Sequence, residues 1–134
     1  MIYSLCTDYK TYGAGMSRVK FIEYNGKKII MMDIDNCSIE EFEKILFDSA
    51  VMIRKENPDS VLSLVSGGQG TPIFTNKDMF MEYLRLNQPF IKASVVCGLP
   101  KMQAAMFQTV VAPTGRELKM FDTKSEAFDW LIAR

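Results

Sequence analysis

The spacing of hydrophobic and polar residues is typical of strands at the start of the chain. Further along, it is typical of helices and strands in turn. Apolar positions in 18–24 and 27–34 predict two strands. Between them, Asn25-Gly26 predicts a tight hairpin, because both residues accept positive φ. The run IIMM at 29–32 indicates that the second strand is buried on both faces. Residues 1–17 have no regular pattern, and we expect an N-terminal arm or a short extra strand there.

Helical and strand patterns alternate through the rest of the chain. Ser38 and Glu41 have the spacing of a capping box and predict a helix that ends at Asn57-Pro58. Three further strands are predicted at 61–66, 91–97 and 117–121. The helix between the first two of these starts near Asn76 and is broken at 87–89.

Two more helices are predicted in the last third of the chain. One begins at Pro100, which suits a first helical turn. Its inward face is predicted from the helical spacing of four residues: Met102, Ala105, Met106 and Val110. The other begins at a second capping-box sequence, Thr123 and Glu126, and turns Ala127, Phe128 and Leu131 inward.

The pattern predicts an α/β fold in one domain, residues 18–134, after an arm at 1–17. We expect a five-stranded mixed, mainly parallel sheet with an N-terminal antiparallel hairpin and about four helices. Loops that follow parallel strands gather at one rim of the sheet, so 33–37, 66–75 and 98–101 should meet there. Such a rim is where open α/β sheets usually bind ligands.

Composition narrows the range of functions. Apolar residues make up 48%, charged residues 24%, and the formal net charge is zero. This balance is typical of a soluble protein and gives no electrostatic attraction to nucleic acid, which we do not expect as a partner. The N-terminus has no secretory leader and no stretch is long enough for a transmembrane segment. Three distant cysteines favour reduced thiols, so we expect a cytoplasmic protein.

The chain contains no histidine. This excludes Ser-His-Asp and Cys-His nucleophile systems and removes the usual nitrogen ligand for metals. Catalysis would have to use carboxylates, lysines, tyrosines or a group of the substrate. We therefore expect no cofactor and no metal, and we predict that the protein is not an enzyme.

The C-terminal half resembles a known family. KASVVCGLPKM and FDTKSEAFDWL are similar to segments of the SpoIIAA-like group of STAS-fold proteins, many of them uncharacterised bacterial domains. In that group a strand ends in a small residue and Gly before a helix, as at Cys97-Gly98. A later strand reaches a Phe-Asp-Thr turn, as at 121–123, and a final helix with the pattern found at 126–131. The order of elements from Arg18 onward also fits.

The resemblance implies a mixed sheet covered by helices, no established catalytic activity and a role in protein interaction or ligand sensing. Some STAS domains control sigma factors through a phosphorylated serine at the start of the helix after the third strand. That subgroup has an Asp-Ser-Ser-Gly type sequence there, whereas this chain has SGGQGTP at 66–72. A regulatory switch phosphorylated on Ser66 or Thr71 is one alternative for this chain.

The candidate binding site consists of residues on the three rim loops: Asn36, Ser66, Gly67, Gly68, Gly70, Thr71, Cys97, Gly98 and Lys101. Glycine lets backbone N–H groups approach an anion, and a following helix N-terminus favours negative charge. The same glycines are equally compatible with a tight exit from a buried strand. They lack both the P-loop ending and the dinucleotide spacing. Cys97 is expected to be a buried structural cysteine.

Asp33-Ile34-Asp35 supports a second alternative. A carboxylate pair after a hydrophobic strand is typical of haloacid-dehalogenase phosphatases, in which the first Asp attacks phosphorus. Ser66 and Lys101 could take the accessory roles, but no acidic pair follows a later strand to hold magnesium. The other interpretation is that both carboxylates cap the strand end.

These observations favour a non-enzymatic domain whose rim binds a small amphipathic or anionic ligand, or a protein partner. The magnesium-dependent phosphoryl-transfer enzyme and the phosphorylated switch remain alternatives. The N-terminal arm and a free edge strand are compatible with a homodimer, and the sequence leaves the oligomeric state open. Ten methionines suit an adaptable pocket or partner surface, although core packing also accounts for them.

Overall fold

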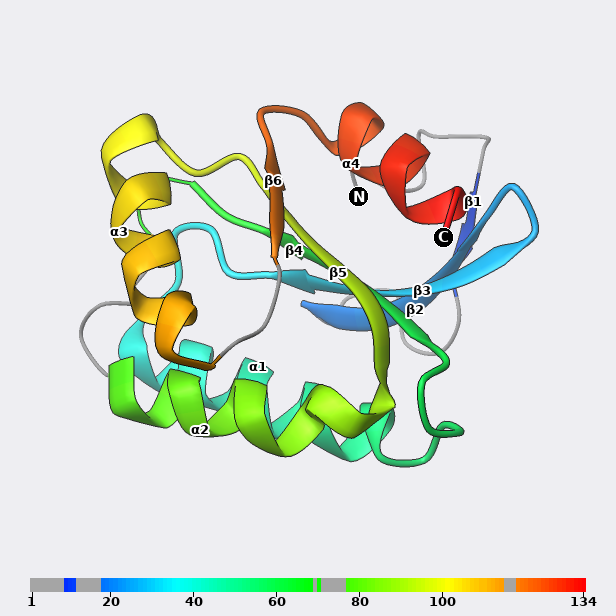
Figure 1. Cartoon of the computed structure of the whole chain (residues 1–134), viewed down its shortest axis with the longest axis horizontal. Coiled ribbons are helices and arrows are strands. Elements are labelled where there is room, and N and C mark those ends of the chain that lie inside the picture. The colour runs from blue at the N-terminus through cyan, green and yellow to red at the C-terminus, as the bar shows by residue number, and fades with distance from the viewer. Residues whose placement is uncertain (1–8, 12–17, 69, 71–76, 115–117) are drawn as a thin grey trace.

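The computed structural model describes residues 9–11, 18–68, 70, 77–114 and 118–134. They form a six-stranded sheet with the strands in sequence order (Figure 1). The strands are β1 (Tyr9–Thr11), β2 (Val19–Tyr24), β3 (Lys27–Asp33), β4 (Val61–Ser66), β5 (Ile91–Cys97) and β6 (Lys119–Phe121). The helices are α1 (Ile39–Ile53), α2 (Lys77–Asn87), α3 (Lys101–Val111) and α4 (Lys124–Ile132), with short 3-10 turns at η3 (Gln88–Phe90) and η4 (Ala112–Thr114).

The sheet is mixed, as the sequence predicted. β2 pairs antiparallel with β1 and β3, and the remaining neighbours are parallel. The five strands predicted after residue 18 are all present, and Tyr9–Thr11 of the arm adds a sixth. This extra strand takes the edge position, so β2 lies one strand inside the sheet.

The hairpin between β2 and β3 has the predicted turn. Asn25 and Gly26 have φ angles of 48° and 80°, both in the left-handed region that Asn and Gly accept. The four residues Ile29 to Met32 are buried, which confirms the two-sided burial inferred from the apolar run. A strand with both faces covered needs helices above and below it.

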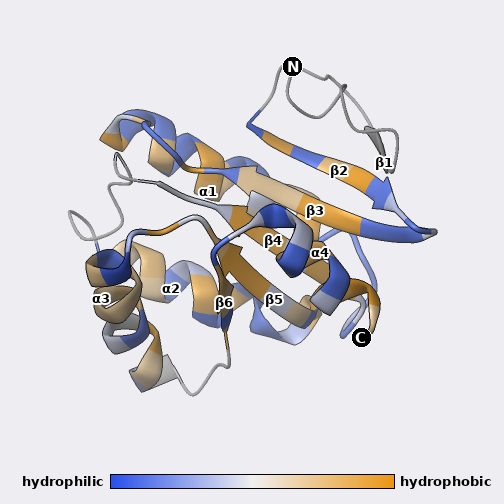
Figure 2. Cartoon of the chain, turned by 90° about the horizontal axis from the view of Figure 1, so that it is seen from above, coloured by the Kyte–Doolittle hydropathy of each residue, from blue (hydrophilic) through white to orange (hydrophobic). Residues whose placement is uncertain are grey.

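Helices cover both faces of the sheet. Sequential strand order with right-handed crossovers places α1, α2 and α3 on one side. After β6 the chain turns back, and α4 lies over the opposite face (Figure 1). Side chains of a strand alternate between the faces, so the core divides into two clusters. Figure 2 shows the most hydrophobic residues concentrated in the central strands.

The inward face of α3 differs from the prediction. Phe107 is fully buried and Val111 nearly so, and both belong to the cluster under α1 and α2. Met102 is 78% exposed and Met106 45% exposed, and Ala105 is exposed as well. Both sets of positions have helical spacing, and Phe107 buries the larger apolar side chain against Phe80. The prediction that Met102, Ala105 and Met106 face inward was therefore wrong, and the side chain of Val110, the fourth residue of that face, lies outside the described residues.

Some element ends also differ from the prediction. α1 has the predicted capping box at Ser38 and Glu41, but it ends at Ile53, before Asn57-Pro58. The Thr123 hydroxyl accepts from the Glu126 amide and donates to the Glu126 carboxylate, which does not reach the backbone of Thr123. β6 begins at Lys119, and its predicted start at Glu117 lies outside the described residues. These shifts leave the topology unchanged.

Candidate functional site

The described parts of the three rim loops meet at the carboxyl ends of β3, β4 and β5, as predicted; residues 69 and 71–75 lie outside the described part of the chain. Four backbone hydrogen bonds, with N···O distances of 2.9–3.3 Å, continue the ladder into the loops: from Ile34 to Ser66, from Cys37 to Gly70, from Gly67 to Cys97 and from Gly98 to Phe121. These bonds align successive strand ends in one row. The described rim is therefore a continuation of the sheet edge.

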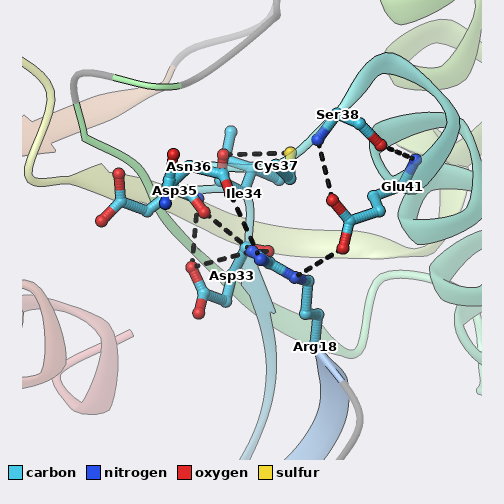
Figure 3. Close-up of polar contacts among 8 residues, drawn as sticks. All are labelled: Arg18, Asp33, Ile34, Asp35, Asn36, Cys37, Ser38 and Glu41. Atoms are coloured by element: carbon cyan, nitrogen blue, oxygen red, sulfur yellow. Dashed lines mark hydrogen bonds and ion pairs between the residues drawn. The ribbon is translucent and has the colours of Figure 1, made fainter.

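Arg18 holds the loop that follows β3 (Figure 3). Its guanidinium donates to the carbonyl oxygens of Asp33, Asp35 and Asn36 at 2.8–3.4 Å. It also lies 3.8 Å from the carboxylates of Asp33 and Glu41. Two further hydrogen bonds fix the ends of the loop. The amide of Asp35 donates to the Asp33 carboxylate, and the amide of Ser38 donates to the Glu41 carboxylate. The backbone of this loop is thus held by side chains of β3, α1 and the residue before β2.

Three rim glycines lie where an added Cβ would meet a neighbouring loop. A Cβ at Gly68 would overlap the Asp35 carboxylate, and one at Gly70 would lie 2.7 Å from the Cα of Asn36. At Gly98, where φ is +84°, a Cβ would lie 2.6 Å from the carbonyl oxygen of Gly67. These contacts support the interpretation that the glycines allow a tight exit from buried strands.

Two of the glycine amides are already engaged. The amide of Gly67 donates to Cys97 and that of Gly98 to Phe121, so neither points at a ligand. A phosphate cradle needs several backbone N–H groups that converge on one anion. The amides of these two residues therefore give a phosphate cradle no support.

A row of polar side chains lies on the α4 face of this rim. Ile22, Met31 and Leu64 belong to the core cluster under α4. Because alternate residues of a strand share a face, Lys20, Asp33 and Ser66, each two positions away along its strand, lie on that face as well. Cys97 is aligned with Ser66 and packs in the same cluster. We call Lys20, Asp33, Ser66, Cys97 and Lys124 of α4 the rim cluster.

Lys20 is the buried cation of the rim cluster, with 3% of its surface exposed. Burial lowers the pKa of its ammonium group, the charge of Asp33 raises it, and the charge of Lys124 lowers it further. The two ammonium groups are therefore close enough to repel each other. The candidate set from the sequence missed both lysines. The sequence did contain a signal for Lys20. It lies two residues before Ile22 in a strand, so the two side chains share the same buried face.

Cys97 is a buried thiol, as expected. It is 2% exposed, and burial raises its pKa to about 11, although the charge of Lys124 and a hydrogen bond with Ser66 act in the opposite direction. A thiol that stays protonated at neutral pH is a poor nucleophile. Ser66 is also buried and lies beside this thiol. A kinase would have to open the rim before it could reach the Ser66 hydroxyl.

The remaining predicted site residues do not gather in one place. Asn36 adopts a φ of 47° at the top of the loop held by Arg18, and its carbonyl oxygen accepts from that side chain. Lys101 is an exposed side chain at the start of α3. Thr71 lies outside the described residues. The described part of the candidate set therefore divides between a packed backbone rim and the rim cluster beneath it.

The rim also has a small hollow with both polar and apolar lining. A cavity of about 70 Å³ lies between the start of α3 and the end of β6, lined by Val96, Leu99, Ala104, Met120, Phe121 and Asp122. Its single charged lining residue is the carboxylate of Asp122. The negative charge of Asp122 makes this hollow unfavourable for an anion.

The elevated pKa of Cys97 predicts a specific dependence of stability on pH. The folded thiol keeps its proton to about pH 11, whereas the unfolded thiol ionises near its usual value of 9.0. Stability is therefore complete below pH 9 and falls as the pH rises toward 11, by on the order of 2 kcal/mol for this group. We expect urea unfolding at pH 8 and pH 10.5 to show a larger loss for the wild type than for Cys97→Ala. Equal losses in both proteins would contradict the assignment.

The carboxylates of the rim have structural partners. Asp33 accepts from the Asp35 amide and pairs with Arg18, which is compatible with the strand-capping interpretation. Among the described residues, no group of three or more Asp, Glu, Cys or His side chains is arranged to hold a metal ion. No described helix is long and apolar enough to span a membrane. Phosphoryl transfer by Asp33 and Asp35 stays a prediction.

Comparison of the chain with protein families, with curated proteins and with solved structures found no match.

Proposed function

We propose that this chain is a non-enzymatic SpoIIAA-like STAS domain that binds a small anionic ligand at the rim cluster. The observation that carries the proposal is the burial of a lysine, Lys20, on the α4 face of the rim, where its ammonium group also feels the positive charge of Lys124 at the start of α4. An anion beside the two lysines would offset the cost of burying the Lys20 ammonium group and the smaller repulsion from Lys124.

The surroundings of the two lysines fit an anionic group. The buried Ser66 hydroxyl forms a hydrogen bond with the Cys97 thiol, so the positive charge of the lysines is what the site offers to an anion. Lys124 is the first residue of α4, where a positive side chain is unfavourable next to the helix dipole. A bound anion would interact favourably with that dipole as well as with the ammonium groups. Asp33 balances part of the charge, so the site would prefer anions small enough to stay away from its carboxylate.

The state of the other reactive groups supports a binding role. Cys97 is protonated and buried, and Asp33 has two structural partners on its carboxylate. The order of strands and helices also agrees with the fold implied by the resemblance to STAS domains. Ligand sensing and protein interaction are the roles that this resemblance implies.

The test is a titration of the full chain with inorganic phosphate at constant ionic strength, followed by NMR. We expect saturable shifts of the amide signals of Ser66, Gly67 and Lys124. Lys124→Gln removes one charge-assisted hydrogen bond and should weaken binding roughly tenfold or more. Lys92→Gln, which changes an exposed lysine at the opposite end of β5, is the matched control and should bind like the wild type.

Two results would overturn this proposal. Equal phosphate affinity of Lys124→Gln and the wild type would show that the rim cluster does not bind the anion. Magnesium-dependent hydrolysis of a phosphate ester that is abolished by Asp33→Asn would favour the phosphoryl-transfer alternative instead.

A further inference from the structure

Asn87, the last residue of α2, is a polar residue in the interior of the protein. Its side chain is 1% exposed, yet neither Oδ1 nor Nδ2 has a hydrogen-bond partner within the described part of the chain. A buried carboxamide without partners is unfavourable by about 1–3 kcal/mol for each unsatisfied group. Native proteins rarely leave such a group unsatisfied, and an internal water is the usual partner.

Asn87 lies beside further polar groups of the central strands. Ser63 of β4 and Ser94 of β5 are directly aligned in the parallel ladder, and both are buried. Together with Asn87 they line one cavity between the sheet and the helices α1, α2 and α3, most of whose other lining residues are apolar. The hydroxyl of Tyr83 also lines it, but this group already contacts Ser49 at 2.7 Å and the Met32 sulfur at 3.2 Å.

The size of this cavity limits what it can hold. Its volume is about 20 Å³, and a single water needs roughly 10–15 Å³ on the same measure. A hydrocarbon chain or an organic ligand does not fit. A bare cation would fit, but no carboxylate lines the cavity to compensate its desolvation. Most of the lining is apolar, and a neutral molecule that both donates and accepts hydrogen bonds matches its polar part, which is Ser63, Tyr83, Asn87 and Ser94 among the described residues.

We propose that this cavity binds one water molecule, held by the Asn87 carboxamide and by the hydroxyl groups of Ser63 and Ser94. The water satisfies Asn87 and links the C-terminal end of α2 to β4 and β5. This explains why a polar residue occupies a position that is otherwise surrounded by Phe80, Leu84 and other apolar side chains. The site is separate from the rim cluster, which lies on the opposite face of the sheet.

The experiment is a high-resolution crystal structure of the full chain combined with NMR of the same protein. We expect a density peak about 2.7–3.2 Å from a polar atom of Asn87. We also expect its side-chain amide protons to show NOE and ROE cross-peaks of opposite sign to a long-lived water. The exposed side chain of Gln88 gives the internal control, because its amide contacts only rapidly exchanging solvent.

Asn87→Leu provides a second measurement, because leucine has a similar volume and no polar atoms. We expect the density peak to disappear in this variant. A wild-type structure with an empty cavity and no such cross-peaks would overturn the proposal, and this result does not depend on whether the variant folds. A peak that persists in Asn87→Leu would also count against it, since the water would then be held by other groups.

Discussion

Replacement of Phe107 by alanine should destabilise the protein by about 3–5 kcal/mol, a large share of the stability of a domain of this size. Phe107 is fully buried, and its ring meets Phe80 of α2 edge-on with centroids 5.4 Å apart. The substitution removes the transfer free energy of the ring and leaves a cavity where α3 and α2 pack on the sheet. Urea unfolding followed by circular dichroism measures the difference.

Met106→Ala is the matched control for this prediction. Met106 is the neighbouring residue of α3 and is 45% exposed, so its truncation should change stability by less than about 1 kcal/mol. The pair distinguishes the two possible orientations of the helix. If Met106→Ala costs as much as Phe107→Ala, or more, the assignment of Phe107 to the buried face is wrong.

Replacement of Gly98 by alanine has the second largest expected effect, about 3 kcal/mol of stability, from two contributions. Gly98 has a φ of +84°, which costs an L-residue roughly 1–2 kcal/mol. Its new Cβ would also lie 2.6 Å from the backbone oxygen of Gly67, and a backbone atom cannot move away without disturbing the rim. Because Gly67 donates to Cys97, we expect the damage to extend to the ends of β4 and β5.

Gly26→Ala separates the two contributions. Gly26 has nearly the same φ, +80°, but no atom lies within 4 Å of the position that a Cβ would occupy there. This variant should lose only about 1 kcal/mol, which is the cost of the backbone conformation alone. Thermal unfolding of the two variants under one buffer condition gives the comparison. Equal losses would show that the contact with Gly67 is not a constraint.

The strands and the connections between them could be predicted because they depend on local patterns. β4 and β5 have the predicted boundaries, and Asn25-Gly26 forms the predicted turn. Each of these depends on residues close in the sequence: an apolar run bounded by turn residues, or a dipeptide that accepts positive φ. The capping box at Ser38 is local in the same sense.

The orientation of α3 could not be predicted from its sequence. KMQAAMFQTVV contains apolar residues around most of the helix, so more than one face has helical spacing. The choice depends on which side chain fits against α2, and Phe80 is the neighbour of Phe107 only after the crossovers bring the two helices together. Periodicity identifies a helix but does not select between two apolar faces.

The sequence predicted where the candidate site lies, but it identified only some of the residues that form it. Parallel strands bring the three loops together, so the sequence alone determined the strand order along the chain, the hairpin and the rim. Which side chains share the rim cluster was decided by the tertiary structure. Lys20 and Lys124 lie far apart in the sequence and come close because α4 packs back over the sheet. The need for small residues in SGGQG was also decided by the tertiary structure. The loop after β3 packs against Gly68 and Gly70, and no local sequence pattern encodes this contact.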